Sequence, residues 1–264
     1  KALKKNVARN QVVIASKVYF NEGRLSRQAI MREIDGTLSR LGTDYLDLYI
    51  IHRFDYDTPI EETMEALHDL VKAGKVRALG ASAMYGYQFY NMQLAARDNG
   101  WTPFSAMENH YNLLYREDER ELLPICKQMK VSLMPYSPLA AGHLARPQWK
   151  SESLRGTTDR VAMGKYDKTE AEDMQIVKRV AELAEKYNCK MSQIAIAWQW
   201  AKGILSPIIG ATKTQYLDDS AGAFDIKLTA EDLAYLEEPY VPHEIVGAID
   251  KNPAQGVILL DEKK

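Results

Sequence analysis

The sequence predicts an α/β protein in which parallel strands alternate with amphipathic helices. Three observations predict this class. Short apolar runs rich in β-branched residues recur along the chain. Each run is followed by a segment whose apolar residues are spaced by three or four, as on one face of a helix. The chain has 264 residues, of which 46% are hydrophobic and 27% charged, so it can bury a large core and is neither disordered nor collagen-like.

Six apolar runs are predicted to form consecutive parallel strands. The first run, Val12–Val18, is apolar on both faces, as expected of a strand that is covered on both sides. The full set is Val12–Val18, Leu46–His52, Val76–Ser82, Phe104–Tyr111, Val131–Tyr136 and Pro207–Ile209. Right-handed crossovers would place the carboxyl ends of all six at one mouth. No Gly-x-Gly-x-x-Gly turn follows the first strand, but periodicity alone does not choose between a doubly wound sheet and a barrel.

The segments between the strands carry helix start signals. Ser26 is a predicted N-cap, and Thr58, Pro59 and Glu61 are predicted to form a capping box at the next helix. Further helices are predicted over Tyr85–Asn99, Glu117–Met129, from Thr169, from Ser192 to about Gly203, from about Gln215 and from Thr229. A long loop is expected between the fifth strand and Asp167.

Charge and composition argue against several classes of protein. Lys and Arg number 34 and Asp and Glu number 36, which gives a net charge of −2 and argues against nucleic acid as a partner. No apolar run reaches the roughly 18 residues of a membrane span. The first residues, Lys1 to Lys5, are not followed by the apolar stretch of a signal peptide. With only two cysteines, Cys126 and Cys189, a chain of this size is expected to be cytoplasmic.

Ionisable residues stand where two predicted strands end. Lys17 is near the end of the first strand and His52 ends the second. In a parallel barrel the active site lies at this end of the strands, and an ionisable group there costs desolvation free energy unless it is paired or functional. A lysine at a strand exit and a core histidine with satisfied hydrogen bonds explain the two positions equally well. All six strand ends carry polar groups, however, which is harder to explain by structure alone.

The last predicted strand leads into Gly210-Ala211-Thr212-Lys213 and the start of a helix. A helix N-terminus with a nearby lysine suits a phosphate group, because exposed N–H groups and the helix dipole both favour an anion. Simple helix capping is the alternative interpretation of the same residues.

Five motifs stand out between Val12 and about Glu238. They are Val13-Ile14-Ala15-Ser16-Lys17, Asp44-Tyr45-Leu46-Asp47-Leu48-Tyr49 through His52, Gly74-Lys75-Val76-Arg77 with Gly80-Ala81-Ser82, Tyr136-Ser137-Pro138-Leu139 and Gly210-Ala211-Thr212-Lys213. With these motifs in this order, the chain resembles the aldo-keto reductase superfamily. The resemblance implies a (β/α)8 TIM barrel over residues 1–238, with about six βα units visible, and a C-terminal tail over 239–264. It also implies an oxidoreductase that reduces aldehydes and ketones to alcohols by hydride transfer from NADPH.

The resemblance also implies residue roles. Lys17 matches the tetrad lysine that tunes a tyrosine, His52 matches the histidine that orients the carbonyl oxygen, and Tyr19 matches an aromatic residue of the substrate pocket. Lys17 and His52 are expected to converge on one pocket with the Tyr136 ring as a wall. The implied cofactor residues are Ser82 and Glu108 at the carboxamide, Tyr136 against the nicotinamide, Ser137, Leu139 and Gly142 around the pyrophosphate, and Gly210, Thr212, Lys213 and Asp219 around the adenosine 2′-phosphate and adenine. No metal is implied.

The sequence departs from the family pattern at several places. Glu108 stands where glutamine is usual, and an ionised carboxylate cannot donate to the carboxamide oxygen. Tyr216 stands about where arginine is common, so a weaker preference for NADPH over NADH is expected. The family's first two βα units, with the tetrad aspartate and tyrosine, have no counterpart in residues 1–264. Residues 1–264 alone are therefore expected to be unstable and essentially inactive, with unpaired sheet edges.

Two functional hypotheses follow. The first is an NADP-dependent aldo-keto reductase acting on a small carbonyl substrate, and the alternative is a non-catalytic barrel subunit that keeps a nucleotide site. Neither hypothesis involves nucleic acid or a membrane. The natural substrate cannot be read from the sequence, because substrate pockets in such barrels are built from variable loops. The tail over 239–264 leaves a homo-oligomer open.

Overall fold

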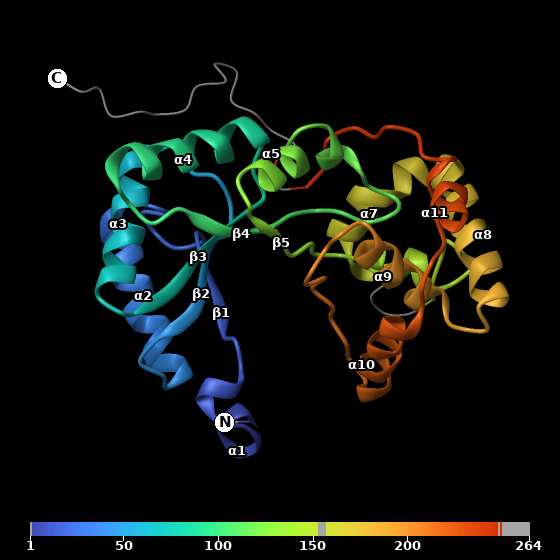
Figure 1. The fold of residues 1–264 in the computed structure, drawn as a ribbon, viewed down its shortest axis with the longest axis horizontal. Helices are drawn as coiled ribbons and strands as arrows, with labels where there is room; N and C mark the ends of the chain where they lie inside the picture. Colours follow the sequence, from blue (N-terminus) through green and yellow to red (C-terminus); the bar gives the residue numbers. More distant parts are fainter. Residues whose placement is uncertain (1, 153–156, 248, 250–264) are drawn as a thin grey trace. The chain divides into compact units, whose positions relative to one another are not determined.

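A computed structural model describes residues 2–152, 157–247 and 249, and the chain divides into two compact units (Figure 1). The first unit contains the described residues up to Met107 together with Ile125–Val131. The second unit contains Glu108–Pro124 and the described residues from Ser132 onward to 249. Most of the 239–264 tail lies outside the described residues, so the division into a 1–238 barrel and a tail stays a prediction.

The first unit is a parallel βα repeat. Its strands follow one another in chain order, and the β1–β2 and β2–β3 pairs are parallel, as predicted. In the paired rows Val18 lies beside Ile51, which in turn lies beside Ala81. Helices α2 (Arg27–Leu41), α3 (Ile60–Lys72) and α4 (Gly86–Asn99) lie along one side of these strands (Figure 1). The elements are α1 (Ala2–Asn6), η1 (Arg9–Gln11), β1 (Ala15–Val18), α2 (Arg27–Leu41), β2 (Leu46–Ile51), α3 (Ile60–Lys72), β3 (Val76–Ser82), α4 (Gly86–Asn99) and β4 (Phe104–Glu108).

The structure contains the cap predicted at the start of α2 but not the one predicted at the start of α3. The hydroxyl of Ser26 accepts a hydrogen bond from the Ala29 N–H, so the predicted N-cap of α2 is confirmed. The predicted capping box at Thr58 is wrong, because α3 begins after Pro59 and has no side-chain cap. The Thr58 hydroxyl instead donates to the buried carboxylate of Asp55 at 2.8 Å. The hydroxyl of Thr58 therefore bonds to a residue three positions earlier, which also accepts from the distant Leu25 N–H, and not to the first turn of α3.

Four residues hold the amino ends of the first two strands together, and we call them the entry clamp: Arg9, Tyr45, Asp47 and Arg77. The Asp47 carboxylate accepts from the backbone N–H of Ile14 at 2.9 Å, which ties it to the chain just before β1. It forms ion pairs with Arg9 at 2.7 Å and with Arg77 at 3.1 Å. Both guanidinium groups lie over the Tyr45 ring, at 3.9 and 3.8 Å from its centroid. The clamp thus links the approach to β1 with β2 and β3.

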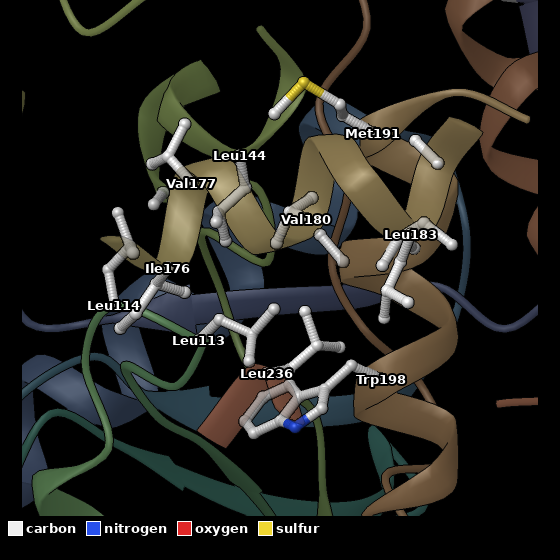
Figure 2. Close-up of a cluster of buried hydrophobic side chains, with 14 of the residues drawn as sticks. Leu113, Leu114, Leu144, Ile176, Val177, Val180, Leu183, Met191, Trp198 and Leu236 are labelled. Atoms are coloured by element: carbon white, nitrogen blue, oxygen red, sulfur yellow. The ribbon is translucent and has the colours of Figure 1, made fainter. Parts of the chain in front are cut away.

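The second unit is built around a hydrophobic cluster. Helices α8 (Glu170–Lys186), α9 (Met191–Ala201) and α11 (Ala230–Glu237) supply most of it, and their apolar side chains point toward one another (Figure 2). The labelled members are Leu113, Leu114, Leu144, Ile176, Val177, Val180, Leu183, Met191, Trp198 and Leu236. Thr229 caps α11 by accepting from the Asp232 N–H, which confirms the start predicted there.

The remaining elements are shorter than the sequence predicts. The single helix expected over Glu117–Met129 is broken in two, because the Pro124 ring is incompatible with a continuous helix through residue 120. The expected loop up to Asp167 contains helical segments, η3 (Ala140–Ala145) and α7 (Arg160–Tyr166) among them. These elements are η2 (Glu117–Arg120), α5 (Leu122–Gln128), β5 (Ser132–Leu133), η3 (Ala140–Ala145), α7 (Arg160–Tyr166), η4 (Asp167–Thr169), α10 (Thr214–Ala221) and η5 (Gly222–Asp225). Among the described residues, no helix is both long and apolar enough to cross a bilayer.

Two predicted strands of the second unit are largely absent. Of Val131–Tyr136, only Ser132–Leu133 is a strand, and Pro207–Ile209 forms a single parallel bridge between Tyr136 and Ile208. The Ile208 N–H donates to the carbonyl of Pro135 at 2.8 Å. Prolines at 135 and 207 carry no N–H, so they cannot extend a ladder. The prediction of a strand over Pro207–Ile209 is therefore wrong.

Candidate functional site

Three of the predicted site residues lie side by side at the carboxyl ends of β1, β2 and β3. Val18, Ile51 and Ala81 form one row of the sheet, so Tyr19, His52 and Ser82 each follow directly after that row. The His52 N–H donates to the Val18 carbonyl at 2.9 Å, which extends the β1–β2 pairing to His52.

Lys17 lies two rows earlier than His52 and is close enough to affect its titration. Burial lowers the pKa of His52, and the positive charges of Lys17 and Arg53 lower it further. The imidazole of His52 is therefore neutral at pH 7, with an ammonium group nearby. Both side chains are half-buried. The predicted convergence of Lys17 and His52 agrees with this electrostatic coupling, whereas Tyr136 belongs to the second unit and its part in that pocket stays a prediction.

Sequence reasoning missed Phe20, whose ring lies edge-on to His52 with 4.9 Å between the ring centroids. The same ring contacts Tyr19 at 5.2 Å, and the Arg53 guanidinium lies 4.8 Å from its centroid. Phe20 is nevertheless 63% exposed. Strand alternation predicts that Phe20 faces away from Lys17, but β1 ends at Val18, so alternation no longer holds there.

Ser82 is 1% exposed and stands at the end of a run of small residues in β3. The nearby Gly80 has no room for a larger residue. A Cβ atom at Gly80 would lie 3.0 Å from Ile50 Cγ1 and 3.4 Å from the Ala106 carbonyl oxygen. The Gly80-Ala81-Ser82 segment is therefore small because neighbouring strands pack closely across it.

The second unit contains a cavity of about 600 Å³. It brings together five of the residues assigned to cofactor binding, which are Ser137, Leu139, Gly142, Gly210 and Asp219. Residues that the sequence did not single out also line it, among them Lys190, Met191, Ser192 and Ser220. They come from the start of α9 and the end of α10, and no local sequence signal connects these two helices.

Two of the residues assigned to cofactor binding lie outside the lining of this cavity. Thr212 and Lys213 are exposed and are not among the residues that line the cavity. Lys213 is the N-cap residue of α10, and its Nζ lies 5.8 Å from the centroid of the Tyr216 ring. Tyr216 itself does line the cavity. The role of Lys213 at a 2′-phosphate stays a prediction.

The loop along one side of the cavity has an unusual backbone. Ser137, Ala140, Ala141 and Gly142 all have positive φ angles, of 57°, 46°, 55° and 100°. Only glycine adopts such angles without strain, and successive residues of this kind can turn backbone N–H groups toward an anion. At Gly142 a Cβ atom would lie 2.7 Å from Arg146 Nη1, which donates to the Gly142 carbonyl at 2.7 Å. Arg146 therefore holds this loop in a shape that needs glycine.

Tyr136 lies in a stack of rings. Its ring is nearly parallel to that of His110, with centroids 5.2 Å apart, and His110 stacks in turn on Tyr115 at 4.2 Å. The His110 Nε2 forms a 2.7 Å hydrogen bond with the Tyr166 hydroxyl. Burial holds the pKa of His110 well below its ordinary value, so the ring is neutral. Next to this stack along the chain, Glu108 is 6% exposed.

Within the described parts of the chain, no three His, Cys, Asp or Glu side chains are grouped so that they could hold a metal ion. The groups that could hold a cofactor are instead the cavity of the second unit and the Lys17–His52 region of the first.

Comparison with known proteins gives consistent matches. Over 88% of its length the chain is 47% identical to an aldo-keto reductase of Fusarium vanettenii, of which it spans 62%. Over 93% of its length it is 42% identical to the versiconal hemiacetal acetate reductase of Aspergillus parasiticus, of which it spans 78%. Its structure is similar to that of a thermostable aldo-keto reductase bound to the inhibitor epalrestat, with a TM-score of 0.73 and 28% identity over 90% of this chain and 74% of the other.

The predicted α/β barrel class is confirmed by that structural similarity together with the parallel strands of the first unit. The sequence model of one family, described as the aldo/keto reductase family, matches residues 1–240. This chain belongs to the aldo/keto reductase family.

Proposed function

We propose that the protein is an NADPH-dependent oxidoreductase that reduces the carbonyl group of an aldehyde or ketone to an alcohol. The observation that carries the proposal is the position of Lys17 and His52 at the carboxyl ends of two adjacent parallel strands, where burial and the charge of Lys17 lower the pKa of His52. Membership of the aldo/keto reductase family supports it, as does the similarity to a reductase of a hemiacetal ester. In the overall reaction the carbonyl compound, NADPH and a proton give the alcohol and NADP⁺.

The two side chains suit an oxygen atom that gains negative charge. A neutral imidazole carries one N–H group, which can donate a hydrogen bond to the carbonyl oxygen. The positive charge of Lys17 stabilises the developing alkoxide, and half-burial strengthens the interaction relative to bulk water. Phe20 and Tyr19 provide apolar surface beside the same oxygen position. When bound, the cofactor would supply the hydride.

The residues present fit a dinucleotide. The cavity of about 600 Å³ is within the usual range for a small-molecule site, about 300–1,000 Å³. The left-handed loop through Gly142 and the start of α9 both meet this cavity, and such backbone suits phosphate oxygens. Ser137, Leu139, Gly142, Gly210 and Asp219 would hold the cofactor there.

The test uses Lys17→Ala in a protein in which residues 1–264 follow a segment that supplies the family's first two βα units, with Lys75→Ala as the matched control. Lys75 is a half-buried lysine of the same unit that pairs with the exposed Asp35. NADPH oxidation is followed with a simple aromatic aldehyde, and NADPH binding by fluorescence titration. We expect Lys17→Ala to abolish turnover while NADPH affinity changes little, and Lys75→Ala to retain both. Turnover by Lys17→Ala at the unmodified rate contradicts the proposal, and NADPH binding without turnover by the unmodified protein favours the non-catalytic nucleotide-binding subunit.

A further inference from the structure

An ion pair lies in the lining of the cavity in the second unit. Lys190, the residue that precedes α9, and Asp219, in the last turns of α10, both line the cavity, and Lys190 Nζ is 2.6 Å from Asp219 Oδ1. The Asp219 side chain is 19% exposed and that of Lys190 is 53% exposed. The carboxylate is thus the more enclosed partner and the lysine side chain the more exposed one.

The backbone of Lys190 is fixed beside α10. The Lys190 N–H donates to Gln193 Oε1 at 2.9 Å, in a capping arrangement at the start of α9. The side-chain nitrogen of Gln193 lies so close to Gly222, just after α10, that any Cβ atom there would collide with it. Gln193 therefore contacts both the Lys190 backbone and the residue that follows α10.

Lys190 is the basic side chain among the described residues that line the cavity, and Asp219 is the acidic one. Lys213, the lysine that the sequence pattern favours for a 2′-phosphate, is exposed and lies outside that lining. An anion in the cavity would therefore meet Lys190 first.

We propose that Lys190 discriminates NADPH from NADH by exchanging its ion pair with Asp219 for one with the adenosine 2′-phosphate. This inference rests on the proposed function and on binding of the nucleotide in this cavity. The ammonium is a compact charge on a flexible stem, so it can turn from a carboxylate to a phosphate without a change of backbone. Asp219 opposes that exchange, because its carboxylate repels a phosphate and can accept a hydrogen bond from a free ribose 2′-hydroxyl. The pair consequently gives a moderate preference for the phosphorylated cofactor.

The test measures binding of two half-cofactors to the full chain, 2′,5′-ADP and 5′-AMP, by calorimetry. The two probes differ only in the 2′-phosphate, so their affinity ratio isolates the interaction in question. Lys190→Ala should weaken 2′,5′-ADP by about 3- to 10-fold, the range for a partly exposed pair, and leave 5′-AMP unchanged. Asp219→Asn should move the ratio the other way, toward 2′,5′-ADP, because Lys190 no longer has a competing partner.

Lys186→Ala is the matched control. Lys186 forms an ion pair of the same length, 2.6 Å, with Asp232, and its side chain is 56% exposed, but it does not line the cavity. This variant should leave the ratio unchanged. The inference is overturned if Lys213→Ala lowers the ratio of 2′,5′-ADP to 5′-AMP affinity and Lys190→Ala does not. It is also overturned if Lys190→Ala weakens the binding of both probes equally. If neither probe nor NADPH binds the unmodified protein, the proposed function fails instead.

Discussion

The two units position their candidate site residues by different means. In the first unit the backbone ladder places Tyr19, His52 and Ser82, because each follows a row of paired strand residues. In the second unit the cavity is formed by a left-handed loop and by the ends of two helices, where few ladder hydrogen bonds exist. The first arrangement depends on local sequence and strand register, and the second on side-chain packing between distant segments.

This difference predicts where each unit is vulnerable. The second unit should depend on its hydrophobic cluster, since packing rather than pairing holds its loops and helices in place. The first unit should depend on the few buried polar groups that connect one βα segment to the next. The predictions below test that contrast.

The largest effect is expected for Trp198→Ala in the second unit. Trp198 is fully buried against Tyr111, and its Nε1 donates to Glu237 at 2.8 Å. Its removal leaves a large void and should lower the free energy of unfolding by about 3–5 kcal/mol in urea titrations. Trp200→Ala is the control, because Trp200 is only half-buried and stacks on the exposed Phe224. Equal losses for the two variants would contradict a special role for the cluster.

A smaller effect is expected for Asp55→Ala in the first unit. The Asp55 carboxylate accepts from the Leu25 N–H at 3.1 Å and from the Thr58 hydroxyl at 2.8 Å, and all three residues are buried. Loss of the acceptor leaves two buried donors unpaired, which should cost about 2–3 kcal/mol of unfolding free energy. Asp57→Ala removes an exposed partner of Arg24 and should cost less than about 1 kcal/mol. An unchanged urea midpoint for Asp55→Ala would show that the ladder alone holds the unit.

The smallest effects concern the titration of three histidines, His52 in the first unit and His110 and His243 in the second. Burial lowers the pKa of His52, assisted by Lys17, and lowers that of His110 much further. Burial also disfavours charge on His243, but the hydrogen bond and charge of Asp173 outweigh it and raise its pKa. NMR titration should therefore give the order His110, His52, His243 from lowest to highest pKa. In Lys17→Met the pKa of His52 should rise but stay below about 6.5, since burial remains.

The same shifts fix the sign of the pH dependence of stability. For His52 and His110 the unfolded chain binds more protons than the folded one once the pH falls below about 6.5, so these groups make the protein less stable as the pH falls. For His243 the folded chain binds the proton more tightly, so its contribution is present at low pH and is lost as the pH rises through its folded pKa. Urea unfolding of His243→Gln and His110→Gln between pH 5 and 8 should show opposite changes in slope; the pH range brackets the usual histidine pKa of about 6.5.

The contrast between the units also explains how far the sequence could predict the structure. The strands over Leu46–Ile51 and Val76–Ser82 agree with the apolar runs, because a strand buried on both faces leaves a continuous apolar signal. The positions of Lys17 and His52 near the carboxyl ends of β1 and β2 follow from the same signal, whereas their catalytic roles stay a prediction. Ser26 and Thr229 could be predicted as caps because their partners are three residues away.

Features that depend on distant partners could not be predicted. Thr58 has the residue type of a cap, but its partner Asp55 is also bonded to Leu25, thirty residues earlier in the chain. The apolar run Pro207–Ile209 has the composition of a strand, yet its proline removes a donor. Lys190 has no sequence signal at all, because its place in the cavity depends on packing between α9 and α10.

The entry clamp limits the positions at which the chain can accept an inserted residue. Arg9, Tyr45, Asp47 and Arg77 fix where the chain enters β1, and Ile14 is tied to Asp47 three residues before Lys17. Because side chains alternate between the faces of a strand, one residue inserted between Ile14 and Lys17 would turn the lysine to the opposite face. An insertion before Arg9 would leave the clamp and the register intact. Length variation among natural relatives should therefore be tolerated ahead of Arg9 and excluded from the three residues that follow Ile14.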